Sequence, residues 1–344
     1  MADEQHSDDS PGPDEAPEPA TRRPPPKRVS IVVPVCNEAG NIAPLAGAVA
    51  DALPETDYEL IFVDDGSDDR TFEQIEREVG RGRGAVGISL SRNFGHQHAL
   101  AAGLQYARGE VVVMMDGDMQ HPPSLLPTLI EKWREGFNVV QTKREDADLT
   151  PLMKRATSRL FYRLYSALCG IRMDPGMADF RLLDRTIIDE LNRMHEGQLF
   201  LRGLVAWMGY RRAVVPFRVA RRHAGRSKYT VRKMLRFAKS GLFSFSSIPL
   251  RIGIVLGVLM GLLSLAEIVF VVVAYLRGQT IAGWASNMFV MSLMFAVLFL
   301  LLGLQGEYIL RIYERVQARP SFLIERVVRK DPPAEADGQK EASK

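Results

Sequence analysis

Several signatures of common nucleotide-dependent and metal-dependent proteins are missing from this sequence of 344 residues. It contains no G-x-x-x-x-G-K-[ST] loop, which disfavours a P-loop nucleotide hydrolase. No G-x-G-x-x-G follows its first strand-like run, which disfavours a dinucleotide-dependent oxidoreductase. The acidic stretch 64–73 has its glycine and glutamate at the wrong positions for an EF-hand.

Cysteine is also scarce. The two cysteines, Cys36 and Cys169, lie in apolar or helical surroundings, which predicts reduced core residues and not a disulfide. His96 and His98 lie two residues apart, but no cysteine or third histidine is near them in the sequence. A histidine metal centre is therefore disfavoured.

Acidic residues are absent from 197–266, whereas residues 202–239 contain twelve lysines and arginines. Such a block is attracted to anionic lipid headgroups. Within residues 231–247, apolar residues recur at helical spacing with basic residues between them, which predicts an amphipathic helix in the membrane interface. The N-terminal segment has the opposite charge: its first 20 residues carry seven carboxylates and no lysine or arginine. We expect residues 1–27 to form a disordered arm that is not a signal peptide.

Two long apolar runs follow the basic block, at 252–275 and 285–304. Each is long enough to cross a hydrocarbon core of roughly 30 Å as a helix. We therefore expect a two-helix membrane hairpin within residues 248–317, followed by a cytoplasmic tail at 318–344. Arginine and lysine flank the hairpin at both ends and only Arg277 lies between the runs, so both ends are expected in the cytosol.

Between the arm and the hairpin, residues 28–230 alternate between strand-like and helical patterns. The strand-like runs are 29–38, 58–67, 85–90 and 110–118, and the helical ones are 42–53, 70–80 and 97–107. Repeated strand–helix units predict an α/β, Rossmann-like domain with a mainly parallel sheet and helices on both faces.

Three of these strands end in polar clusters, which are Asn37-Glu38, Asp64-Asp65 and Asp116-Gly117-Asp118. Because parallel strands end at one edge of a sheet, the clusters are expected to form one acidic crevice. An isolated D-x-D is equally well explained as a polar turn. Mg²⁺ or Mn²⁺, however, is usually held by one or two carboxylates together with substrate phosphates. The pattern therefore favours a divalent cation and a substrate that carries phosphate.

Five motifs, in order, carry a resemblance to a known family. They read VPVCNEAGNI, FVDDGSDDRT, SRNFGHQHALAAGLQYARGEVVVMMDGDMQHPP, ADFRLLDR and RRHAGRSKYT. Together they resemble the family 2 glycosyltransferases of GT-A fold, specifically the polyprenyl-phosphate glycosyltransferases that include dolichol-phosphate mannose synthase and the bactoprenol glucosyltransferases. The resemblance covers residues 28–315, and the hairpin is more similar to the bactoprenol type.

The resemblance implies roles for particular residues. The nucleotide-sugar site would comprise Pro34, Asn37, Glu38, Asp64, Asp65, Asp116, Gln120, Arg222, Ser227 and Lys228. Asp116 and Asp118 would hold Mg²⁺ or Mn²⁺. Asp118, Asp179 and Arg181 would lie at the reacting centre, and Lys154, Arg155 and Ser158 would bind the acceptor phosphate.

The implied function is inverting transfer of a sugar from a nucleotide-sugar to polyprenyl phosphate at the cytoplasmic face of the membrane. Similarity to the bactoprenol type favours a UDP-sugar such as UDP-glucose over GDP-mannose. A processive polysaccharide synthase is the alternative enzyme, but its Q-x-x-R-W signature is absent. A membrane-anchored sugar-nucleotide sensor is the non-enzymatic alternative. We expect no nucleic-acid partner. Helix–helix contacts through the G-x-x-x-G at Gly257 and Gly261 could support a homo-oligomer. A separate flippase is expected to carry the lipid product across the membrane.

Asp179 has a second interpretation. A hydroxyl acceptor must lose a proton as it attacks, so an acid at this position would serve as general base. A phosphate monoester has a second pKa of about 6 and is mostly a dianion near neutral pH. We therefore expect Asp179 to orient groups around the acceptor, for example by holding Arg181, with a helix N-cap or surface ion pair as the structural alternative.

Overall fold

The structure is a computed structural model that describes residues 22–82, 84–144, 177–194, 201–217, 248–278, 283–317 and 319–330. Several predictions lie outside these residues. They concern Lys154, Arg155, Ser158, Arg222, Ser227, Lys228, the amphipathic helix at 231–247 and most of the two terminal segments. All of these stay predictions.

An eight-stranded sheet forms the centre of the α/β domain, with strand order β7-β5-β6-β4-β1-β2-β3-β8. The strands are β1 Val29–Val35, β2 Tyr58–Asp64, β3 Ala85–Leu90, β4 Val111–Met114, β5 Val139–Arg144, β6 Met177–Asp184, β7 Arg212–Phe217 and β8 Ile324–Arg329. β1 to β4 pair in parallel, as predicted. β6 pairs antiparallel with both β4 and β5, and β8 pairs antiparallel with β3. The sheet is therefore mixed.

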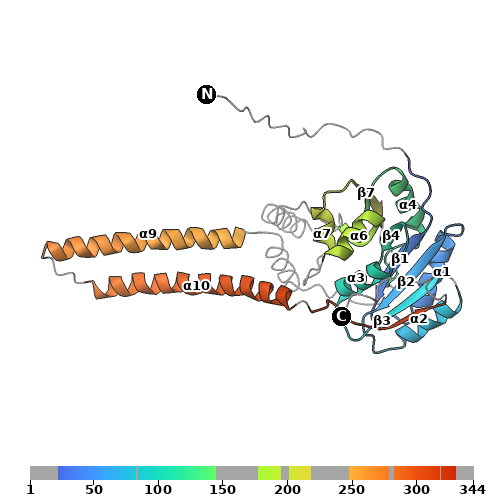
Figure 1. The fold of residues 1–344 in the computed structure, drawn as a ribbon, viewed down its shortest axis with the longest axis horizontal. Helices are drawn as coiled ribbons and strands as arrows, with labels where there is room; N and C mark the ends of the chain where they lie inside the picture. The colour runs from blue at the N-terminus through green and yellow to red at the C-terminus, as the bar shows by residue number, and fades with distance from the viewer. Residues whose placement is uncertain are drawn as a thin grey trace, which may run out of the picture.

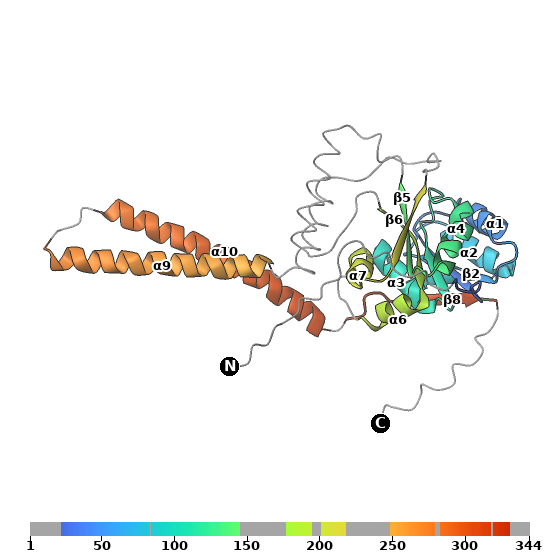
Figure 2. The same ribbon diagram turned by 90° about the horizontal axis from the view of Figure 1, so that it is seen from above.

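Helices cover both faces of this sheet (Figure 2). α1 (Ile42–Ala52), α2 (Thr71–Gly80) and α4 (Leu126–Arg134), with the short turn η1 (Pro123–Leu125), contribute to one buried apolar cluster. α3 (His96–Tyr106), α6 (Arg185–Arg193) and α7 (Leu201–Trp207) contribute to the other. Every residue of β1 is buried, which explains why its sequence is apolar on both faces except at Ser30, whose hydroxyl donates to the Glu59 carboxylate. Burial of each large apolar side chain stabilises the fold by about 1.5–3 kcal/mol.

Two segments outside the predicted strand–helix units also pack on this domain. Residues 22–27, predicted as the end of the arm, lie against α4: the Arg23 guanidinium is 2.9 Å from the Asp184 carboxylate and stacks over the Trp133 ring. β8 comes from the segment predicted as a cytoplasmic tail. It is short, largely exposed and half charged, so its sequence carries no clear strand signal.

Two long helices, α9 (Ile248–Leu276) and α10 (Trp284–Val316), run side by side away from the α/β domain (Figure 1). By length and composition, Ile252–Phe270 and Phe289–Glu314 are each able to cross a membrane, and their side chains are almost entirely unburied. A Cβ at Gly257 would contact Leu301 of α10, so this glycine faces the neighbouring helix of its own chain. The predicted use of Gly257 and Gly261 in an oligomer gains no support from this packing.

Candidate active site

The ends of β1, β2 and β4 meet at one edge of the sheet. Val35 is in register with Asp64, and Val32 is in register with Met114, so the polar residues that follow these strands lie together, as predicted. They border an open cavity of about 420 Å³. Its lining residues are Pro34, Val35, Cys36, Glu38, Asp65, Asn93, Gly95, His96, Asp116, Gly117 and Asp118.

Asn37 and Asp64 shape the turns beside the cavity and do not line it. The Asn37 backbone N–H donates to the Ser67 hydroxyl, and the Asn37 side-chain oxygen accepts from the Asp68 N–H, each at 2.9 Å. Asp64 accepts from the backbone and the hydroxyl of Ser67. Burial raises the pKa of the Asp64 carboxyl above its ordinary value, although these hydrogen bonds oppose the rise. Asn37 thus holds the loop after β2 against the loop after β1, and Asp64 fixes Ser67 within the loop after β2.

Asp65 holds a second loop. Its carboxylate accepts from the backbone N–H groups of Phe94 at 2.7 Å and Gly95 at 2.9 Å, and only 4% of the residue is exposed. The next residue, Gly66, has a φ of 65°, and a Cβ there would lie 2.5 Å from the backbone of Arg92. Glycine is therefore required where the two loops touch. The contact fixes the position at which α3 begins.

The D-x-D turn is held by the buried His121, which is not among the predicted site residues. His121 is fully buried and stacks on Phe180 with 5.1 Å between ring centroids. Its Nδ1 accepts from the Asp116 backbone N–H at 3.0 Å, which requires a neutral ring tautomer. Burial lowers the pKa of His121, consistent with that neutral state. The only sequence signal was its place directly after MDGDMQ.

Asp116 and Asp118 present two carboxylates to the cavity. The Gln120 backbone N–H donates to Asp118 at 3.1 Å, whereas the Gln120 residue itself is only 5% exposed. Within the described ranges, no group of three or more metal-ligating side chains forms a closed cage. Two hard oxygen donors on an open wall fit Mg²⁺ or Mn²⁺ that completes its coordination with substrate phosphate and water.

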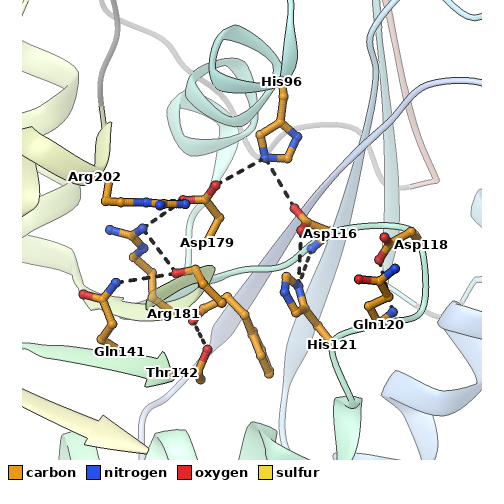
Figure 3. Close-up of polar contacts among 12 residues, drawn as sticks. His96, Asp116, Asp118, Gln120, His121, Gln141, Thr142, Asp179, Arg181 and Arg202 are labelled. Atoms are coloured by element: carbon orange, nitrogen blue, oxygen red, sulfur yellow. Dashed lines mark hydrogen bonds and ion pairs between the residues drawn. The ribbon is translucent and has the colours of Figure 1, made fainter. Parts of the chain in front are cut away.

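Asp179 reaches the same edge because β6 runs antiparallel to β4, with Arg181 in register with Met114. Two arginines converge on it (Figure 3). Arg181 and Arg202 each place Nη2 2.9 Å from Asp179 Oδ1. Burial would raise the pKa of Asp179, but Arg202 and Arg181 outweigh it and lower the pKa to about 2. Asp179 is therefore a carboxylate whose charge is already balanced.

Arg181 does not face the cavity. Its side chain is 1% exposed, and beyond Asp179 its guanidinium contacts the Ala178 carbonyl oxygen at 3.4 Å. Burial lowers the pKa of Arg181 to about 10, so the side chain stays charged at neutral pH. Asp179 is the carboxylate that pairs with this buried charge, and Arg181 is a partner of Asp179 and does not line the cavity.

Two residues at this site were missed by sequence reasoning. Arg202 lies in the basic block, where its charge was interpreted as attraction to lipid. His96 was considered only as half of a metal pair with His98. Its Nε2 lies 3.3 Å from Asp116 Oδ1 and 4.0 Å from Asp179 Oδ2, so it stands between the two acidic groups (Figure 3). Only the fold brings the start of α3 close to both Asp116 and Asp179.

Comparison with known proteins agrees with this architecture. The model of the family described as "Glycosyl transferase family 2" matches residues 30–191. A glycosyltransferase of Synechocystis (sll0501) is 37% identical over 299 residues, covering 86% of this chain and 94% of the relative. YkcC, a glycosyltransferase of Bacillus subtilis, is 38% identical, covering 86% and 93%. The SfII prophage-derived bactoprenol glucosyl transferase of Shigella flexneri is 33% identical, covering 89% and 100%. The chain therefore belongs to glycosyltransferase family 2, with that family's Rossmann-like GT-A domain, and is a glycosyltransferase.

Proposed function

We propose that this glycosyltransferase moves a sugar, with inversion, from a nucleotide-sugar to polyprenyl phosphate at the cytoplasmic face of a membrane. One observation carries the proposal: the two sides of the crevice have opposite electrostatic character. Asp116 and Asp118 are carboxylates on the cavity wall, whereas Asp179 is paired with two arginines. The first arrangement suits a metal-bound diphosphate, and the second suits an acceptor that brings its own negative charge.

On the donor side, Asp116 and Asp118 would hold Mg²⁺ or Mn²⁺. When bound, the cation supplies Lewis-acid stabilisation of the negative charge that develops on the departing nucleoside diphosphate. Pro34, Glu38 and Asp65 border the cavity and form the wall for the nucleotide. His121 and Gln120 keep the two carboxylates oriented, because both attach to the D-x-D turn by hydrogen bonds.

On the acceptor side, an oxygen of the lipid phosphate attacks the anomeric carbon of the sugar. The bond from that carbon to the diphosphate oxygen breaks, and the nucleoside diphosphate leaves with the electron pair. No proton is transferred, because a phosphate monoester is mostly a dianion near neutral pH. A carboxylate with a pKa of about 2 is in any case a weak base. Asp179 therefore acts as a positioning residue that keeps Arg202 and Arg181 in place.

The nature of the donor and the lipid is part of the proposal. Relatives named bactoprenol glucosyl transferase support a glucosyl donor and a bactoprenol-type lipid, for which we propose UDP-glucose and an undecaprenyl-type or decaprenyl-type phosphate. A GDP-mannose-using mannose synthase is the alternative. Incubation of the purified chain with a panel of labelled nucleotide-sugars and polyprenyl phosphate tests the assignment, with extraction of label into organic solvent as the readout.

Three outcomes separate the hypotheses. We expect one sugar per lipid, formed from one donor. A polymer would indicate a processive synthase, and binding of nucleotide-sugar without any transfer would indicate a sensor.

The membrane topology is also proposed, from the arginine and lysine bias around the two apolar helices. In a chain with Cys36 and Cys169 replaced by serine, a cysteine at Gln279 should react with an impermeant thiol reagent added outside the cell. A cysteine at Asp57, exposed on the α/β domain, should not react. The opposite pattern would place the catalytic domain on the other side of the membrane.

A further inference from the structure

The apolar hairpin is inserted between the two edges of the catalytic sheet. β7 precedes the hairpin in the sequence and β8 follows it, and these two strands are the outermost strands of the sheet. In chain order, α9 and α10 thus lie between the strand at one edge of the sheet and the strand at the opposite edge. A short return segment that pairs with the sheet restricts the orientation of the domain more than a long linker would.

β8 is well attached to its neighbours. It pairs with β3 from Val86–Arg329 to Leu90–Ile324, and Val328 packs against the core. The Arg326 guanidinium lies 2.9 Å from the Glu76 carboxylate and stacks over the Phe72 ring.

β8 begins at the edge of the sheet that carries the active site. Because it runs antiparallel to β3, its first residue, Ile324, is opposite Leu90, the last residue of β3. The Ser91 backbone N–H donates to the Leu323 carbonyl at 2.9 Å. Phe322 and Ile324 pack on the same apolar cluster as Phe94. The loop at residues 91–95 is therefore held by the return segment on one side and by Asp65 on the other, and it leads directly into His96.

The return path is short. Eight Cα steps from Val316 at the end of α10 to Ile324 span at most about 29 Å of extended chain. The active-site edge, and not the opposite edge, is thus tied to the membrane-proximal end of α10. A lipid acceptor whose phosphate lies at the headgroup level must reach this edge.

We propose that residues 322–329, which include β8, are a positioning element that turns the active-site edge toward the membrane and braces the loop before His96. The inference rests on the proposed lipid acceptor for its catalytic consequence. Its structural part, docking of β8 on β3 of the same chain, is independent of that acceptor.

The first test lengthens the return path without changing the catalytic residues. Ten Gly/Ser residues are inserted between Arg319 and Pro320, both exposed, so that the seven linking residues become seventeen. Effective concentration falls roughly as the −3/2 power of linker length, so kcat/KM for polyprenyl phosphate in bilayers should fall about fourfold. A short-chain prenyl phosphate in solution should be turned over at an unchanged rate. The same ten residues inserted after Lys330, beyond β8, serve as the matched control and should change neither value.

Equal loss with both acceptors, or no loss with either, would overturn the positioning role. If the wild type transfers no sugar to any prenyl phosphate, the proposed function fails, and the second test still decides whether β8 docks.

The second test does not use activity. Ile88 and Val327 are opposite each other in the β3–β8 ladder. With Cys36 and Cys169 replaced by serine, the Ile88→Cys/Val327→Cys variant should form a disulfide within one chain on mild oxidation. A covalent dimer would instead show that β8 docks on a second copy, and absence of any cross-link would show that it does not dock. Either result contradicts the inference. Ile88→Cys paired with Glu325→Cys, two residues out of register, is the control and should cross-link poorly.

Discussion

The carboxylates that follow β4 and that of Asp179 in β6 lie at the same edge of the sheet but have different partners. Asp116 forms no ion pair with an arginine or lysine among the described residues, and its ion-pair contacts there are with His96 and His121. Asp179 contacts two arginines through one oxygen. The same type of side chain is thus placed in two electrostatic environments: after β4 its negative charge has no arginine or lysine ion-pair partner among the described residues, and in β6 two arginines balance it. Under the proposed function, this difference separates a donor side, which holds a cation, from an acceptor side.

The largest effect should come from the donor side. Asp118→Asn removes one of two anionic oxygen donors, and a Lewis-acid contribution of several kcal/mol corresponds to a loss of more than about 10³-fold in kcat. Initial rates with saturating Mg²⁺ or Mn²⁺ measure it. Asp57→Asn, an exposed carboxylate outside the site, is the control and should leave the rate unchanged. Full turnover by Asp118→Asn, or by wild type in excess chelator, would refute the metal role.

The second-largest effect is expected on the free energy of unfolding, from substitution of Asp179 on the proposed acceptor side. Asp179→Asn leaves the buried Arg181 charge without its anionic partner, which should lower the free energy of unfolding by about 3 kcal/mol. Combining it with Arg181→Met removes both charges and should recover most of the loss. Asp118→Asn should change stability little, because Asp118 has no cationic partner among the residues described. Thermal unfolding of the detergent-solubilised chain measures all three.

The pH dependence of that loss follows from the sign of the pKa shift. The pKa of Asp179 in the folded chain is about 2, below the ordinary value near 4. Ionised Asp179 therefore stabilises the fold above about pH 4, and this contribution disappears as the pH falls toward 2. The difference between wild type and Asp179→Asn should shrink over that interval. A constant difference would mean that the loss comes from packing.

A smaller effect is expected where the two sides meet. His96→Gln removes the ring that lies between Asp116 and Asp179, and loss of a group that orients a metal ligand typically costs about 10–100-fold in activity. His98→Gln, on the same helix but with no ion pair to Asp116 or Asp179 among the described contacts, is the matched control and should cost much less. If both substitutions reduce kcat equally, α3 has been disturbed as a whole and His96 has no special role.

Part of this architecture was predictable because it depends on local patterns. The Val- and Ile-rich runs predicted β1 to β4, and their parallel pairing predicted that Asp64 and Asp116 would lie near one another. The apolar helices were equally clear from their length. The antiparallel insertion of β6 and the return of β8 were not predictable, because both depend on pairing partners that are far away in the sequence. Arg202 and His96 depend on the same long-range contacts.

The rate of sugar transfer to polyprenyl phosphate as a function of pH, for wild type and Asp179→Asn, tests most directly the claim that Asp179 positions groups and is not a base. Rates are taken with saturating donor, at a temperature at which both proteins are folded. The wild-type rate should rise only through the range near pH 6, where the acceptor phosphate ionises, and then stay level. Asp179→Asn should show the same rise at a lower rate. A wild-type rise that follows an active-site carboxylate and disappears in the variant would contradict the account.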